Sequence, residues 1–328
     1  MIPRVAARNM QSSFLDDLPD GLHVGLCGAG SPLTDPERSG PCVAVVAGER
    51  LYVVDAGSGS SQNLGRMRMS QGEIDGILLT HFHSDHIDGL GQMLMQRWVN
   101  GAHTLPAPIH GPEGVEQVVA GFNQAYAQDA IYRAAHHGED IVPPSGTGAR
   151  ARPFPLPAPG EGVKIVDDRG LTITTFSVDH EPVRPAVGYR FDYKGRSVLV
   201  SGDTSKSANL QQFADGVDLL VHEALDPKLV GGLTEGARNA ERPRTVKITT
   251  DILNYHASPV EVGEIARDAG AHEILFYHIV PPLLFSTMEE IFVEGVADVF
   301  SGPVTVGRDG TFVSLPAGSD EITKRDLF

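Results

Sequence analysis

Cysteine is scarce in this sequence: only Cys27 and Cys42 occur among 328 residues. Two cysteines are too few for a framework of several disulfides or for a zinc ribbon held by thiolates, and they fit either a reducing or an oxidising compartment. Any bound metal ion must therefore rely on histidine and carboxylate ligands. The chain has 13 histidines, which can supply them.

Basic residues are in the minority, with 26 Lys and Arg against 42 Asp and Glu and a formal net charge of −16. No cluster of Lys and Arg stands out, so a broad nucleic-acid surface is not expected and a small-molecule substrate is favoured. The sequence also lacks an apolar run of the ~20 residues that a membrane span needs, and residues 1–20 lack the apolar core of a signal peptide. We expect a soluble protein, cytoplasmic or periplasmic, and leave open whether a signal or anchor was removed.

Short β-branched runs alternate with amphipathic segments along the whole chain. The β-branched runs predict strands at residues 23–27, 43–46, 51–54, 74–79, 171–176, 187–193, 197–201, 219–222 and 274–277. Helical spacing of apolar residues predicts helices at residues 87–99, 115–127, 260–269 and 287–297. This interleaving indicates an α/β protein in which two sheets pack face to face with helices outside.

No segment reads as a convincing linker between domains. Residues 142–162 are dense in Pro and Gly, which predicts an extended surface loop without regular structure. The candidate metal ligands described below lie on both sides of this loop and are expected to form one site. We therefore expect a leader at residues 1–20, followed by a single domain at residues 21–328.

The segment Thr80-His81-Phe82-His83-Ser84-Asp85-His86 carries the most chemical information. It joins a predicted strand to a predicted helix. In extended chain, alternate side chains point the same way, so His81 and His83 can share one point while Asp85 and His86 turn toward a neighbouring one. This geometry suits two metal ions. Imidazole nitrogen and carboxylate oxygen are ligands of Zn²⁺, and Mn²⁺ or iron would accept the same mixture.

Four residues of one loop cannot complete two coordination shells, so distant ligands are required. Three later segments each end an apolar strand with a suitable side chain. These side chains are His180, Asp203 and His278. Strand ends hold such side chains rigidly, which makes the three residues the candidates for the missing ligands.

Together these segments resemble the metallo-β-lactamase superfamily, whose signature is HxHxDH followed by a His, an Asp and a His at strand ends. The resemblance runs from Gly28 to about Val306 and implies a four-layer αββα sandwich with two mixed sheets. It implies one metal ion held by His81, His83 and His180, a second held by Asp85, His86 and His278, and Asp203 as the bridge between them. Asp55 then matches an acidic residue that orients a ligand rather than binding metal.

Two further segments, residues 219–224 (LLVHEA) and 255–259 (YHASP), resemble ribonuclease Z, in which a Glu and a His form a proton relay. The corresponding side chains here are Glu223 and His256, although the neighbouring threonine and serine positions of that family are changed. His222 is interpreted as a buried core histidine rather than an extra ligand, because both metal shells are filled without it.

Three other segments, residues 35–41, 96–101 and 136–139, look closer to the arylsulfatase-like zinc enzymes related to ribonuclease Z. This branch is therefore favoured. It implies a hydrolase with two Zn²⁺ per chain, in which a metal-bridging hydroxide cleaves a small ester of the aryl sulfate or phosphodiester type. Asp85, Glu223 and His256 are the expected catalytic residues, with His256 protonating the leaving oxygen. The family also implies a homodimer.

Three alternatives stay open. A ribonuclease Z-like endonuclease that processes transfer-RNA 3′ ends is supported by Glu223 and His256, but the loop at residues 142–162 has only Arg150 and Arg152 where a basic arm would be expected. Hydrolysis of a β-lactam or lactone is a second alternative, as a promiscuous activity. The third is a metal-binding scaffold without catalysis.

Overall fold

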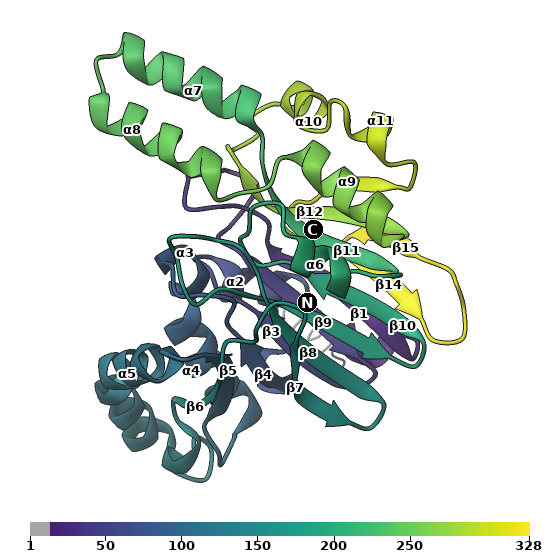
Figure 1. Cartoon of the computed structure of the whole chain (residues 1–328). Helices are drawn as coiled ribbons and strands as arrows, with labels where there is room; N and C mark the ends of the chain where they lie inside the picture. Colours follow the sequence, from purple (N-terminus) through teal and green to yellow (C-terminus); the bar gives the residue numbers. More distant parts are fainter. Residues whose placement is uncertain (1–13) are drawn as a thin grey trace, which may run out of the picture.

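The computed structural model describes residues 14–328, so most of the predicted leader, residues 1–13, lies outside the described residues. Two β-sheets pack face to face, and helices cover their outer faces (Figure 1). This is the predicted fold class, which the structure confirms. No helix within residues 14–328 combines the length and the hydropathy of a membrane span.

The first sheet has eight strands in the order β15-β14-β1-β2-β3-β4-β5-β6. Their bounds are β1 Gly21–Gly28, β2 Cys42–Ala47, β3 Arg50–Val54, β4 Ile74–Leu78, β5 Ala107–Pro112, β6 Ala149–Phe154, β14 Thr311–Pro316 and β15 Thr323–Asp326. Strands β3 to β6 run parallel to one another, while β1, β2 and β3 are antiparallel neighbours.

The second sheet has seven strands in the order β13-β12-β11-β10-β9-β8-β7. Their bounds are β7 Gly162–Asp168, β8 Leu171–Ser177, β9 Val187–Tyr193, β10 Arg196–Val200, β11 Leu219–Leu225, β12 Glu273–Val280 and β13 Val304–Val306. Strands β10 to β13 are parallel, so their carboxyl ends meet at one edge of the sheet, where functional side chains can converge.

Helices lie between the strands. Their bounds are α2 Ser60–Arg66, α3 Ser84–Ile87, α4 Leu90–Gly101, α5 Val115–His137, α6 Ala208–Phe213, α7 Pro227–Asn239, α8 Pro243–Asp251, α9 Pro259–Ala269, α10 Ser286–Phe292 and α11 Val296–Val299, with short 3₁₀ turns η1 Phe14–Asp17, η2 Gln71–Glu73, η3 Pro144–Gly146 and η4 Ile252–Asn254. The main core fills the space between the sheets, where Val24, Val45, Phe191 and Val221 are fully buried.

The structure corrects three predictions of local structure. The helix expected at residues 287–297 is interrupted between α10 and α11, where Gly295 has a φ of +84°. The helix expected at residues 87–99 is interrupted between α3 and α4, where a Cβ at Gly89 would lie 2.3 Å from the carbonyl oxygen of Gly57. The segment at residues 142–162 was expected to have no regular structure, but it contains β6. Among residues 14–328, this strand pairs only with β5, at the edge of the sheet, so Pro153 can lack an N–H group without breaking a ladder.

Cys27 and Cys42 form a disulfide, which the sequence alone did not predict. The cysteines are 15 residues apart, but the antiparallel pairing of β1 with β2 brings them together, since Cys42 lies opposite Gly28. Both are fully buried. The bond closes the loop at residues 28–41, and Ala29 in that loop accepts a hydrogen bond from the backbone N–H of Ile279, which follows His278.

Removing this disulfide should lower the free energy of unfolding by about 3 kcal/mol. A disulfide that closes a loop of 15 residues restricts the unfolded chain, so its removal stabilises the unfolded state by that amount. Urea unfolding of the Cys27→Ala/Cys42→Ala variant would measure the loss. Wild-type protein reduced in denaturant is the matched control, since it keeps both sulfur atoms. Equal midpoints for oxidised and reduced wild-type protein would contradict the expectation.

Candidate metal centre

The predicted metal loop connects β4 to α3, and its two ends have different backbone geometry. His81 and His83 lie in the extended part, whereas Asp85 and His86 lie in the first turn of α3. The four side chains therefore leave the backbone in two directions. The imidazole rings of His81 and His83 remain close, with centroids 4.7 Å apart.

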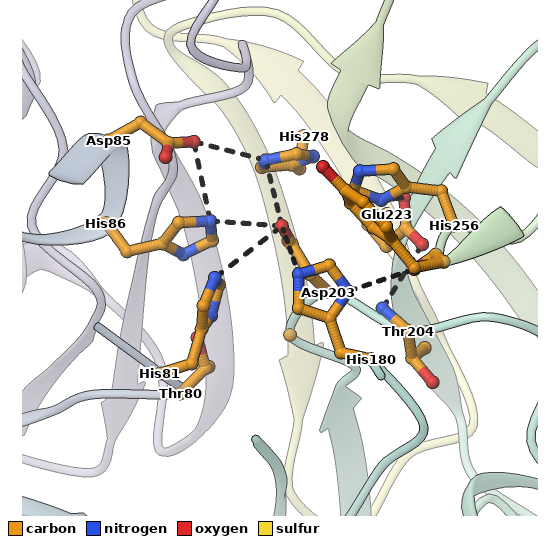
Figure 2. Close-up of polar contacts among 12 residues, drawn as sticks. Thr80, His81, Asp85, His86, His180, Asp203, Thr204, Glu223, His256 and His278 are labelled. Carbon is orange, nitrogen blue, oxygen red and sulfur yellow. Dashed lines mark hydrogen bonds and ion pairs between the residues drawn. The ribbon is translucent and has the colours of Figure 1, made fainter. Parts of the chain in front are cut away.

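The seven side chains predicted as ligands converge at the edge formed by the strand ends. Figure 2 labels six of them, all but His83. They form two groups, within each of which the ligand atoms lie within 4.8 Å of one another. The first group is His81, His83, His180 and Asp203, and the second is Asp85, His86 and His278. The first group contains the three residues expected at one ion together with Asp203, and the second contains the three residues expected at the other.

Asp203 lies at the centre of the two groups (Figure 2). Its Oδ2 atom is 3.3 Å from His278 Nε2, 3.4 Å from His86 Nε2, 3.8 Å from His81 Nε2 and 3.9 Å from His180 Nε2. Burial opposes the charge of this carboxylate, but the imidazoles of His278 and His86 outweigh that effect and hold its pKa well below the usual value. Asp203 is therefore a carboxylate placed between the groups.

A glycine positions Asp203. Gly202 has a φ of +63°, a conformation that side-chain-bearing residues rarely adopt. A Cβ at this position would also lie 2.6 Å from the carbonyl oxygen of Val187. The sharp turn after β10 therefore requires glycine, and it directs the next side chain into the cluster.

Several buried polar atoms of the cluster have no hydrogen-bond partner among the described residues. They include the Nε2 atoms of His81, His86 and His180 and the Oδ1 atom of Asp203. Buried polar atoms are normally paired, so a group of unpaired nitrogen and oxygen atoms around one centre fits a divalent metal ion. Burial also lowers the pKa of His81 well below its ordinary value and that of His180 to about 4, which favours the neutral imidazole that binds metal.

Asp55 contacts the ring nitrogen of His86 that faces away from Asp203, which fits the orienting role expected from the sequence. Its Oδ2 atom accepts hydrogen bonds from His86 Nδ1 at 2.8 Å and from the hydroxyl of Thr80 at 2.8 Å, and its Oδ1 atom accepts from the backbone N–H of Thr80. With Nδ1 engaged, His86 directs Nε2 toward Asp203. Such contacts fix both the tautomer and the orientation of an imidazole.

Two supporting residues, Thr80 and Tyr255, were not predicted from the sequence. Thr80 precedes the first histidine of the motif, and its position between the β4 strand and His81 was a usable signal. Tyr255 supports His180 through its backbone carbonyl, which accepts a hydrogen bond from His180 Nδ1 at 2.9 Å. A backbone contact between residues 75 positions apart leaves no trace in the sequence.

A β-bulge directs His278 into the cluster. In the pairing of β11 with β12, Glu223 lies opposite Tyr277 and Ala224 lies opposite Ile279, so His278 has no partner and has a φ of 43°. An unpaired bulge residue can turn its side chain away from the regular alternation of the strand.

His222 lies beside the bulge rather than among the ligands. It is fully buried, and its Nδ1 atom donates to the carbonyl oxygen of Glu223 at 2.6 Å. It belongs to none of the groups of side chains that could hold a metal ion. The interpretation as a core histidine therefore agrees with the structure, and its contact supports the backbone of the bulge.

The predicted relay pair lies next to the second metal group (Figure 2). Glu223 Oε2 accepts a hydrogen bond from His256 Nδ1 at 3.1 Å, while its Oε1 atom accepts from the backbone N–H of Ala257 at 3.0 Å. One ring nitrogen of His256 lies within 4.8 Å of the ligand atoms of Asp203 and His278. Glu223 is completely buried, which raises the pKa of its carboxyl, and these hydrogen bonds orient it toward His256.

Comparison with known proteins agrees with this geometry. The family model described as the metallo-beta-lactamase superfamily matches residues 35–249. A ribonuclease Z of Mycobacterium bovis is 35% identical over 290 residues, which cover 88% of this chain and 96% of that protein. A ribonuclease Z of Mycobacterium avium is 33% identical over 300 residues, covering 91% of this chain and 100% of that protein.

Solved structures share the fold at lower sequence identity. The short form of human tRNase Z superposes with a TM-score of 0.64 at 19% identity, covering 90% of this chain and 99% of that one. A metallo-beta-lactamase fold protein from Bacillus subtilis superposes with a TM-score of 0.63 at 20% identity, covering 90% and 100%. The chain thus belongs to the metallo-β-lactamase superfamily, has ribonuclease Z proteins among its homologues, and is a metal-dependent hydrolase.

Proposed function

We propose that the protein is a phosphodiesterase of the ribonuclease Z type that cleaves precursor RNA. The observation that carries this proposal is the pair Glu223 and His256, hydrogen-bonded beside the metal cluster in a chain that is 35% identical to a ribonuclease Z over 88% of its length. The sequence alone favoured a small ester substrate. The homologues support the RNA alternative better, so RNA becomes the first candidate substrate and a small ester the second.

We propose two Zn²⁺ ions as the resident metals. His81, His83 and His180 would hold one ion, Asp85, His86 and His278 the other, and Asp203 would contact both. This assignment is supported by the two groups of ligand atoms and by the unpaired nitrogen atoms that face Asp203. When bound, such ions supply positive charge beside the scissile phosphate and a water molecule of lowered pKa.

The side chains of the relay supply the proton. Glu223 accepts the Nδ1–H group of His256, so the other ring nitrogen is the one that can hold a proton for the leaving oxygen. Asp85 lies on the far side of the cluster, where its Oδ2 atom is 3.3 Å from His278 Nε2 and 3.5 Å from His86 Nε2. Its carboxylate can both bind metal and accept a hydrogen bond from the attacking water.

Small ester hydrolysis remains a second candidate because of a pocket next to the cluster. This pocket has a volume of about 530 Å³ and is lined by His180 together with Leu156, Pro159, Asp179 and Arg184. Its size and its mixture of apolar and polar walls are typical of small-molecule sites. The net charge of −16 also favours a small substrate over a large polyanion.

A parallel activity screen of the zinc-loaded protein separates the two candidates. The substrates are precursor transfer RNA, an aryl phosphodiester, an aryl sulfate, a β-lactam and a lactone, each with a chelated control. We expect kcat/KM for the RNA to exceed the others by at least about 100-fold, equivalent to roughly 2.7 kcal/mol of extra transition-state binding. Rates within about tenfold for several small substrates, without RNA cleavage, would favour the small-ester candidate.

A further inference from the structure

Helices α7 and α8 form a hairpin that projects from the body of the protein (Figure 1). In the sequence, this hairpin separates the two relay residues, Glu223 and His256. The helices are joined by a hydrogen bond from the hydroxyl of Thr234 to that of Thr249 at 2.8 Å. At its base, Val230 is fully buried in a small apolar cluster. The hairpin is thus a formed element with its own internal contacts.

The charge of the hairpin is opposite to that of the rest of the chain. Residues 227–251 contain five basic and three acidic side chains, for a net charge of +2, which leaves −18 on the remainder. The basic residues are Lys228, Arg238, Arg242, Arg244 and Lys247. A polyanion approaching this protein would therefore meet a favourable surface at the hairpin.

Two of these basic side chains are free for a partner. Arg242 and Arg244, at the turn between α7 and α8, are exposed, and their guanidinium groups have no ion pair or hydrogen bond with the residues from 14 to 328. The other three are engaged, in the pairs Lys228 with Glu294, Arg238 with Glu235, and Lys247 with Asp251. Free guanidinium groups match the geometry of phosphate oxygens.

The turn between α7 and α8 lies far from the metal cluster, and this distance limits the size of substrate that can contact both. The base of the hairpin lies at the cluster, since the ring of Tyr255 is 4.6 Å from that of His180. Helix α7 has 13 residues and spans about 20 Å at 1.5 Å per residue. A small diester bound at the cluster cannot extend that far, whereas a folded RNA can.

We propose that Arg242 and Arg244 contact the phosphate backbone of the RNA substrate, away from the bond that is cleaved. This inference rests on the proposed function and assigns part of substrate recognition to the hairpin tip. The contacts are electrostatic and independent of base sequence. They therefore contribute to binding, expressed in KM and in salt dependence, and leave the chemical step unchanged.

The test uses the full chain with Arg242→Gln/Arg244→Gln, assayed on precursor transfer RNA and on bis(p-nitrophenyl) phosphate. We expect KM for the RNA to rise about tenfold with kcat unchanged, and the slope of log binding constant against log salt to become shallower by about 1.4–1.8, the effect of losing two phosphate contacts. Hydrolysis of the small diester should stay at the wild-type rate, which also shows that the variant is folded.

The matched control is Lys164→Gln/Arg169→Gln, which removes two exposed basic side chains from β7 and the turn that follows it. An equal rise in KM in this control would assign the effect to total charge and overturn the proposal. RNA cleavage with unchanged KM and salt slope in the tip variant would also overturn it, while the proposed function would stand.

Wild-type protein that cleaves the small diester but no RNA would overturn the proposed function itself. Binding to anionic lipid vesicles instead of RNA, lost in the tip variant, would assign the tip to a membrane surface.

Discussion

Asp203→Asn should lower kcat/KM by roughly 10³-fold, equivalent to about 4 kcal/mol of transition-state stabilisation. Asp203 places a carboxylate oxygen within 3.3 to 3.9 Å of four imidazole nitrogens, at the centre of both ligand groups. Asparagine keeps the size of the side chain but removes its negative charge. The bound metal content should therefore fall along with the activity. Steady-state kinetics and elemental analysis of the purified variant would measure both effects.

The matched control for this substitution is Asp320→Asn, which changes an exposed aspartate outside the ligand groups. It should leave both the metal content and the activity at wild-type values. If Asp203→Asn retained two metal ions per chain and more than about a tenth of the activity, Asp203 would not be the residue that joins the two groups.

His256→Ala should slow the cleavage of poor leaving groups by roughly 10² to 10⁴-fold, the usual contribution of general acid catalysis. An alkoxide leaving group needs a proton, whereas a nitrophenolate leaves without one. The loss should therefore be large for RNA or an alkyl phosphodiester and small for a nitrophenyl ester. Parallel assays of the two leaving groups, at the same metal loading, would measure the difference.

Two further variants support the interpretation of that result. Glu223→Gln should show the same dependence on leaving group, because the Glu223 carboxylate orients His256 through its Nδ1 atom. His272→Ala, which changes an exposed histidine outside the ligand groups, should have no effect. Equal losses for both leaving groups in His256→Ala would show that His256 is not the general acid.

The metal loop was the part of the site most accessible to sequence reasoning. His81, His83, Asp85 and His86 lie within six residues at a junction of strand and helix, so their directions follow from local backbone geometry. The fold class was equally accessible, because β-branched runs and amphipathic segments alternate throughout the chain. In these elements, the local secondary-structure propensity and the pattern of buried residues favour the same structure.

The distant residues His180, Asp203 and His278 were candidates because each ends an apolar strand. Only the family resemblance assigned them to particular ions, since a strand-end His or Asp is common in α/β proteins. The side-chain direction of His278 depends on a bulge in the pairing of β11 with β12. That bulge is a property of two strands separated by about 50 residues in the chain. Spacing within either strand does not reveal it.

The sequence by itself determined the α/β class, the nine expected strands, two of the four expected helices and the presence of a His and Asp metal motif. These features depend on side-chain type and short-range spacing. Only the tertiary structure decided the disulfide between Cys27 and Cys42, the edge strand β6 in the Pro-rich segment, and the free arginines at the α7–α8 turn. Each of these depends on strand register or on which charges find partners. Such contacts join residues that are far apart in the chain and are fixed only when the sheets pack.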